Sequence, residues 1–340
     1  MSYSVDILNN IRLNASTEYQ TRIPAATREN ITSIGQAFQT YEPLYNEFCE
    51  ALINKIGKTI ILQKMFKNPL ARFKSGQVSP HDIEEIFIEM AKAEGAYDPD
   101  GKNPLGRREG PDVKVVYHRQ NRQDYYAISM GDIDFLRVFR NESTLDVFIK
   151  GKINAVYAGD EYDEYLAMKN VLATFPKIDG TGCGYFDYEV KDMAGSTSKE
   201  QFAKDFVKTL RKAVNDVKFP SKSYNAAGVM TSSKPEDLVL LVHKDITTEV
   251  DVELLAKAFH TSNTDLKVVP TIIELDDFGA LTDTYALLVD ADWFRIFDTY
   301  VTMRKQENAQ GLFTNYFFHH HQILSASPFR TAVRLKRVSA

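Results

Sequence analysis

The amino-acid sequence predicts an α+β protein, on three observations. Its 340 residues are about twice the usual length of a single domain. Segments with the 3.6-residue period of helices and short apolar runs typical of strands both occur, without the strict strand–helix alternation of a doubly wound sheet. The composition, 44% hydrophobic and 26% charged, is that of an ordinary folded chain. We therefore expect two domains, or one domain with large insertions.

The N-terminal region predicts an arm followed by two helices. Residues 1–26 mix polar side chains with isolated Ile and Leu and show no sustained period, which indicates an extended arm. Thr27 is a suitable N-cap for the first helix, and Gly57 is expected to end the second. The apolar face of the second helix comprises Leu44, Phe48, Leu52, Ile53 and Ile56.

Residues 58–128 predict a projecting excursion. Ser79 and Pro80 form a cap and first-turn signal for a helix through Ile83, Phe87 and Met90, ending at Gly95. A stretch rich in Gly and Pro follows, and 113–128 then predicts a hairpin. Acidic side chains gather on the predicted helix, and basic ones gather after it. The basic set is Lys102, Arg107, Arg108, Lys114, Arg119 and Arg122.

The longest helical pattern covers 144–175, which would make a rod about 45 Å long. Gly159 makes a bend or interruption the alternative, because glycine in a helix interior costs about 1 kcal/mol relative to alanine. A second breaker-rich stretch, 176–198, indicates a domain boundary. Beyond it we expect helices and strands in alternation. The helices are 199–217, 252–259 and 293–308; the strands are 238–242, 268–275, 286–289, 317–323 and 331–338.

Motifs for catalysis or cofactor binding do not emerge from the sequence. The loop from Gly95 to Asn103 superficially resembles a phosphate-binding loop, but it has the wrong glycine spacing and lacks the Ser or Thr that would hold magnesium. Glycines at 180, 182 and 184 miss the dinucleotide pattern, because Tyr185 occupies the third position. We therefore expect no enzyme activity and no cofactor.

Histidine, acidic and cysteine positions favour structural roles. Of three successive histidines, only His319 and His321 could converge on one face of a strand, and a metal site or a histidine switch near pH 6 is the lesser alternative to an aromatic strand. The carboxylates at 276, 277, 290 and 292 are expected to cap loops. Cys49 and Cys183 are expected to be buried free thiols rather than metal ligands or a disulfide.

Charge and hydropathy limit the partners. The net charge of −5 and a pI near 5.9 disfavour general nucleic-acid affinity. No apolar run approaches 18 residues, and the first ten residues lack a cationic segment followed by an apolar stretch. We expect a protein without membrane contact, made in the cytoplasm.

Several segments of the second half form a recognisable set. Asn225–Gly228, Asp251–Phe259, Val289–Trp293 and 308–319 follow one another in an order and spacing that resemble major capsid proteins of tailed bacteriophages. The resemblance spans about a hundred residues. It implies a virion capsid subunit with the Hong Kong 97-type shell fold, which has an N-terminal arm, an extended loop, a peripheral domain with a long spine helix, and an axial domain.

The resemblance also implies a domain layout. Residues 1–26 would be the arm, 27–57 and 129–179 the peripheral domain with the spine at 144–175, and 58–128 the extended loop. Residues 180–288 would form the axial domain, and 289–340 would return to the peripheral domain. Copies would assemble as hexamers and pentamers into an icosahedral shell, with portal and scaffolding proteins, around double-stranded DNA. A net negative interior would let the DNA lie near the wall without adhering.

Charge segregation suggests how neighbouring copies orient. We expect the basic residues of the loop region to face an acidic set on an adjacent copy, namely Asp160, Glu161, Asp163 and Glu164. Exposed pairs of this kind contribute about 0–1 kcal/mol each, so apolar contact must supply most of the affinity. The alternatives are a solvated charged face for these residues, an encapsulin-type compartment shell, and a two-domain cytoplasmic enzyme.

Overall fold

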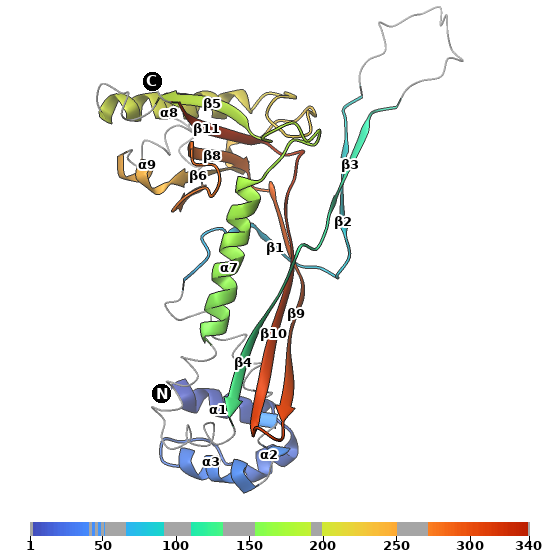
Figure 1. Cartoon of the computed structure of the whole chain (residues 1–340), viewed down its shortest axis with the longest axis vertical. Coiled ribbons are helices and arrows are strands. Elements are labelled where there is room, and N and C mark those ends of the chain that lie inside the picture. The colour runs from blue at the N-terminus through green and yellow to red at the C-terminus, as the bar shows by residue number, and fades with distance from the viewer. Residues whose placement is uncertain are drawn as a thin grey trace, which may run out of the picture. The chain divides into compact units, whose positions relative to one another are not determined.

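The computed structural model describes residues 3–40, 43, 44, 47, 48, 51, 66–91, 110–131, 154–191, 199–249 and 271–338. Helices and strands both occur, as the sequence predicts, and they belong to two compact units (Figure 1). Unit 1 comprises Met1–Asn68, Arg122–Glu164 and Asp298–Gln322. Unit 2 comprises Pro69–Asn121, Tyr165–Phe297 and Ile323–Ala340.

The N-terminal segment of unit 1 is helical, so the prediction of an extended arm is wrong. Its helices are α1 (Tyr3–Asn14), α2 (Thr17–Arg22) and α3 (Ile31–Thr40). The Ser16 hydroxyl caps α2 by accepting a hydrogen bond from the Tyr19 N–H at 3.2 Å. Leu8, Ile11 and Tyr19 are buried in one core with Phe38. These apolar residues are too sparse to show a period, but the surrounding core gives them a place to bury.

A four-stranded sheet has the order β1-β9-β10-β4. Its strands are β1 (Lys74–Gln77), β4 (Arg122–Gly131), β9 (Phe294–Asn308) and β10 (Phe313–Ala326). β10 and β4 are antiparallel, with Phe313 opposite Gly131 and Gln322 opposite Arg122. The predicted strand 317–323 is confirmed within β10, whereas the predicted helix 293–308 is wrong because that segment forms β9. It carries β-branched and aromatic residues, which favour the extended state once neighbouring strands are available.

A two-stranded sheet replaces the helix predicted after Ser79. Strand β2 (Ile83–Ile88) alternates half-buried and exposed side chains at every residue, which is the period of a strand. It pairs antiparallel with β3 (Val113–His118). The hairpin predicted for 113–128 is therefore wrong. Both of its strands exist, but β3 pairs with β2 and β4 pairs with β10.

Unit 2 contains a five-stranded sheet with the order β5-β11-β8-β6-β7. The strands are β5 (Phe186–Lys191), β6 (Leu238–His243), β7 (Thr271–Leu275), β8 (Thr284–Asp290) and β11 (Ala332–Val338). The helices are α8 (Lys199–Asp216), α9 (Lys244–Glu249) and two 3-10 turns, Ala71–Phe73 and Pro235–Asp237. The predicted strands 238–242, 286–289 and 331–338 and helix 199–217 are confirmed. The predicted strand 268–275 is confirmed from Thr271 onwards, and the predicted helix 252–259 lies outside the described residues.

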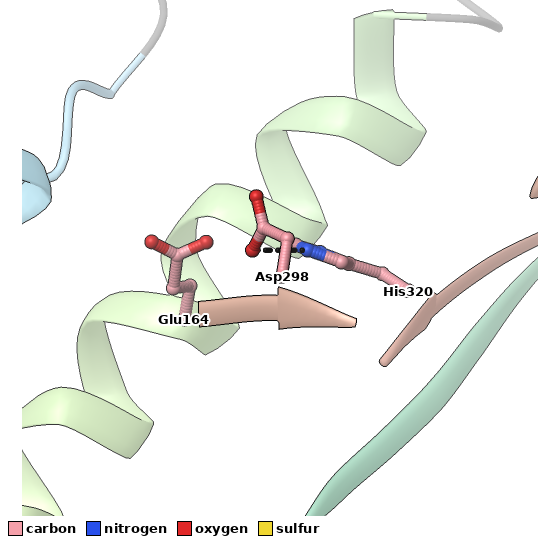
Figure 2. Close-up of side chains that lie close together, drawn as sticks. All are labelled: Glu164, Asp298 and His320. Carbon is pink, nitrogen blue, oxygen red and sulfur yellow. Dashed lines mark hydrogen bonds and ion pairs between the residues drawn. The ribbon is translucent and has the colours of Figure 1, made fainter. Parts of the chain in front are cut away.

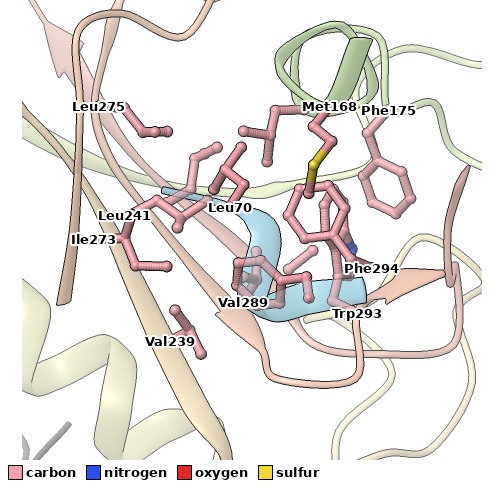
Figure 3. Packing of buried hydrophobic residues seen from close by; sticks show 14 of the residues in the cluster. Leu70, Met168, Phe175, Val239, Leu241, Ile273, Leu275, Val289, Trp293 and Phe294 are labelled. Carbon is pink, nitrogen blue, oxygen red and sulfur yellow. The ribbon is translucent and has the colours of Figure 1, made fainter. Parts of the chain in front are cut away.

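Side chains on opposite faces of this sheet enter two different cores. Leu240 of β6 belongs to the core that includes Phe206 and Leu210 of α8. Its neighbour Leu241 belongs to the core that includes Met168 and Trp293 (Figure 3). Because both faces are covered, β6 is a continuous apolar run rather than an alternating one.

Helix α7 (Asn154–Ala173) confirms the C-terminal two thirds of the predicted spine, and residues 144–153 lie outside the described part of the chain. Gly159 is helical, so α7 is not interrupted there. The described part of the breaker-rich segment, 176–191, belongs wholly to unit 2. The predicted boundaries of arm, loop, peripheral and axial domains stay a prediction.

Candidate functional site

The β2–β3 sheet presents an apolar face to solvent. Ile86 lies opposite Val115 and Ile88 lies opposite Val113 in the antiparallel register. These four side chains are between 41% and 61% exposed. Met90, just beyond β2, is also exposed. We call this surface the hairpin face. A contiguous exposed apolar patch marks an interaction site in a soluble protein.

The opposite side of the same sheet packs against the rest of unit 2. The Phe87 ring stacks on Phe329 with centroids 5.5 Å apart. The Lys114 ammonium donates a hydrogen bond to the Ala227 carbonyl oxygen at 2.9 Å. Because one side is used in this way, the hairpin face is the side left open.

A half-buried carboxylate anchors the sheet. Glu85 accepts a hydrogen bond from the Arg295 guanidinium at 2.7 Å and lies 3.0 Å from Nε2 of His118. Burial raises the pKa of the Glu85 carboxyl, but His118 and Arg295 outweigh it and lower the pKa to about 2. Glu85 is therefore ionised at neutral pH, and its two partners fix the position of β2.

A second set of polar side chains, buried except for the half-buried Asp298, lies in unit 1, and Figure 2 shows three of them, Glu164, Asp298 and His320. We call it the polar cluster; it comprises Arg122, Asp160, Glu164, Asp298, His320 and Gln322. Nδ1 of His320 lies 2.7 Å from Oδ2 of Asp160, and Nε2 lies 3.1 Å from Oδ1 of Asp298. The Arg122 guanidinium donates to Oδ1 of Asp160 at 2.7 Å. Two cations and three carboxylates thus meet around α7, β4, β9 and β10.

The polar cluster has the donor types of a metal site, and its described contacts form an ion-pair network. One ligand atom each of Glu164, Asp298 and His320 lies within 4.8 Å of the others. Burial lowers the pKa of His320, but hydrogen bonds to Asp160 and Asp298 outweigh it and raise the pKa to about 9. The ring is then an imidazolium at neutral pH, with both N–H groups directed at carboxylates. A metal requires the unprotonated nitrogen lone pair.

The structure corrects part of the predicted set of contacts between copies. Arg122, Asp160 and Glu164 are buried and paired inside the same chain, so they are not available to a neighbour. Lys102, Arg107 and Arg108 lie outside the described residues.

The remaining members of that set are partly exposed. Arg119 forms an exposed ion pair with Asp82 at 3.3 Å. Lys114 makes the hydrogen bond to Ala227 described above. Asp163 is exposed and accepts from the Tyr126 hydroxyl. Glu161 accepts from the N–H of Asn68 at 3.1 Å. Their contact with another copy stays a prediction.

Sequence reasoning missed the histidine that matters. His319 and His321 share a face, with ring centroids 6.3 Å apart, as the alternation of a strand predicts. The buried one is His320, whose partners lie 160 and 22 residues away in the chain. The local sequence signal for a buried His320 is strand alternation, which places it on the face opposite to His319 and His321.

The predicted loop carboxylates and thiols have mixed outcomes. Asp277 accepts from the N–H of Gly279, and Asp290 accepts from the N–H of Asp292, as expected of loop caps. Asp276 and Asp277 both pair with Lys169 at 2.8 Å. Cys183 is a free thiol and half-buried, whereas Cys49 lies outside the described residues. Among the described helices, none has the length and apolar character needed to cross a membrane.

Solved structures with this fold define the class of the protein. The chain aligns with the capsid of Staphylococcus phage Andhra with a TM-score of 0.60 at 13% identity, covering 83% of this chain and 87% of that one. It aligns with the mature capsid of bacteriophage PhiM1 with a TM-score of 0.51 at 10% identity, covering 81% and 89%. The fold is therefore that of a phage capsid subunit, of the Hong Kong 97 type.

The sequence comparisons identify the family. The model of the Phi29-like phage major capsid protein family matches residues 8–336. The major capsid protein of Bacillus phage B103 is 35% identical over 335 residues, which are 97% of this chain and 72% of that protein. That of Streptococcus phage Cp-1 is 28% identical, covering 96% and 92%. The chain belongs to the Phi29-like major capsid protein family, a family of structural shell proteins. The encapsulin and enzyme alternatives receive no support from these comparisons.

Proposed function

We propose that copies of this protein form the hexamers and pentamers of an icosahedral phage head, assembled in the host cytoplasm with portal and scaffolding proteins around double-stranded DNA. The hairpin face is the observation that supports this most directly. A closed shell needs each copy to bury surface on several neighbours, and an apolar strand pair that projects from its unit suits that purpose. The contacts of Glu85 and Phe87 fix the position of the hairpin face before a neighbouring copy binds.

The experiment replaces the central pair of the hairpin face. Ile86→Thr with Val115→Thr keeps β-branched side chains in both strands, so the sheet should remain folded, but it replaces apolar surface by hydroxyls. We expect the wild type to form uniform hollow particles in negative-stain electron microscopy and the double variant to sediment as folded small species. Phe219→Ser is the matched control, because Phe219 is 71% exposed elsewhere in unit 2.

Wild-type yield of particles from the Ile86/Val115 variant would refute the role of the hairpin face. A wild-type chain that never exceeds a small oligomer in size-exclusion chromatography would refute assembly itself. Co-purification of a cargo protein in place of DNA would instead identify a compartment shell.

Charge pairing between copies is a separate part of the proposal. Because Arg122, Asp160 and Glu164 are buried, they no longer belong to the predicted contact set. The proposed charge pairing now rests on the basic segment around Arg107 and Arg108, which would meet exposed acids such as Asp163 on a neighbour. Reversing both arginines to glutamate should lower the yield and stability of shells. Unchanged shells would rule the pairing out.

A further inference from the structure

Helix α8 of unit 2 carries an exposed basic surface. Its side chains at positions 204, 208, 211 and 212 are all Lys or Arg and all exposed. Their spacing of three and four residues places them on one side of the helix. We call this surface the α8 basic face. The whole chain has a net charge of −5, so this concentration of positive charge is local.

The described hydrogen bonds of two acidic residues of α8, Asp205 and Asp216, are with residues outside the α8 basic face. Asp205 is half-buried and accepts a hydrogen bond from Gln201 at 3.1 Å. Asp216 is half-buried and accepts from the Tyr188 hydroxyl at 2.6 Å. The described contacts of Lys212 include the Tyr188 ring, with the ammonium 5.7 Å from its centroid. Asp216 is therefore held by the sheet and Asp205 by its neighbour on the helix, while the four basic side chains are exposed.

The other side of α8 fixes the helix in place. Phe202, Phe206, Leu210 and Val214 are buried in the core that α8 shares with β5, β6, β8 and β11. Figure 1 shows α8 lying along the five-stranded sheet. The basic side chains thus project from a rigid element, which lowers the entropy lost when they bind a partner.

We propose that the α8 basic face binds the phosphate backbone of double-stranded DNA and lies on the inner wall of the shell. The inference rests on the proposed function, since that function puts DNA inside. Positions 204 to 212 span about 12 Å along the helix axis, which corresponds to roughly three or four phosphates along one DNA strand. Lysine and arginine contacts to phosphate carry no sequence information, as a container for any part of a genome requires.

The expected affinity of one copy for DNA is low, which suits a shell that must release its DNA. Non-specific contacts of a few phosphates give dissociation constants of about 10⁻⁴ to 10⁻⁶ M at physiological salt. Each copy would therefore hold DNA weakly and release it readily, while the many copies of a shell together bring the outer layer of DNA to the wall. This replaces the expectation, drawn from net charge alone, that the wall does not attract DNA.

The test measures how binding depends on salt. Unassembled full-length protein is titrated onto a short fluorescent DNA duplex of mixed sequence at several KCl concentrations. Each phosphate contact contributes about −0.9 to the slope of log K against log salt, so four contacts predict a slope of about −3 to −4. Lys204→Ala and Lys208→Ala should each reduce its magnitude by about 1, and the double variant by about 2.

Matched variants separate this effect from general loss of charge or of fold. Alanine is the strongest helix former, so neither substitution should unfold α8, and circular dichroism checks this. Lys234→Ala removes another exposed lysine of unit 2, which is paired with Glu236, and should leave the slope unchanged. Lys208→Arg keeps the charge and should keep the slope.

Two results would overturn the inference. One is a slope that is the same in wild type and in the Lys204/Lys208 double variant, which would make the face merely solvated. The other is a double variant that binds DNA normally but forms no particles, which would assign the face to a protein partner. Particle formation is scored separately by electron microscopy. A wild type that binds DNA with the predicted slope but forms no shell would contradict the proposed function and not the α8 contact.

Discussion

Substituting His320 by glutamine should remove a pH dependence of stability that the polar cluster creates. In the folded chain, Asp160 and Asp298 overcome the effect of burial and raise the pKa of His320 from 6.5 to about 9. The protonated ring is therefore favoured by folding. Its contribution is fully present below pH 6.5 and is lost as the pH rises through 9.

The magnitude follows from the size of the shift. A difference of about 2.5 pKa units, at 1.36 kcal/mol each, gives about 3 kcal/mol of stability at low pH. About 2–3 kcal/mol of this remains at pH 7, and almost none at pH 10. His320 is only 4% exposed, so solvent screens its two ion pairs little.

The assay is urea unfolding of unassembled protein, followed by far-ultraviolet circular dichroism at steps from pH 6.5 to 10. Other groups titrate in this range, so the informative quantity is the difference between wild type and His320→Gln. We expect this difference in the free energy of unfolding to be about 2–3 kcal/mol at pH 7 and to close to nearly zero at pH 10. His81→Gln, at an exposed position, is the control and should show no such gap. A gap that stays constant with pH would refute the assignment of a buried imidazolium.

Three further outcomes follow from the same structure. Asp160→Asn leaves Arg122 and His320 without their shared carboxylate and should cost about 3–5 kcal/mol in urea unfolding, because a buried charge loses its partner. Phe206→Ala empties a fully buried position and should cost about 3–5 kcal/mol in thermal unfolding, whereas Phe219→Ala, at an exposed position, should change stability by less than about 0.5 kcal/mol. Adding EDTA should leave the melting temperature unchanged in differential scanning calorimetry, because the described ion pairs of the polar cluster join protein groups to one another. A clear drop would show that a metal is bound.

Some elements could be predicted because the order of apolar residues within the segment is enough to indicate its secondary structure. The run from Leu238 to Val242 is apolar at every position and could only be a covered strand or a buried helix, and its length favoured the strand. The α8 segment repeats apolar residues every three or four positions, so it forms a helix whichever sheet it covers.

Other elements were ambiguous at the local level. Ile83, Phe87 and Met90 have helical spacing, yet the same segment also alternates as a strand, and only pairing with β3 decides between the two. Segment 294–308 likewise became a strand because β10 offers a neighbour. A strand obtains its hydrogen bonds from another segment, so its stability does not depend on its own sequence alone.

The sequence by itself determined the α+β class, the shell-protein resemblance and the elements with one clear apolar face. The tertiary structure alone decided which strands pair, which side of the β2–β3 sheet stays open, and that Arg122, Asp160 and Glu164 lie inside the protein. The reason is that hydrophobic periodicity is local in the chain, whereas strand pairing and the burial of a charge both require partners that are distant in sequence.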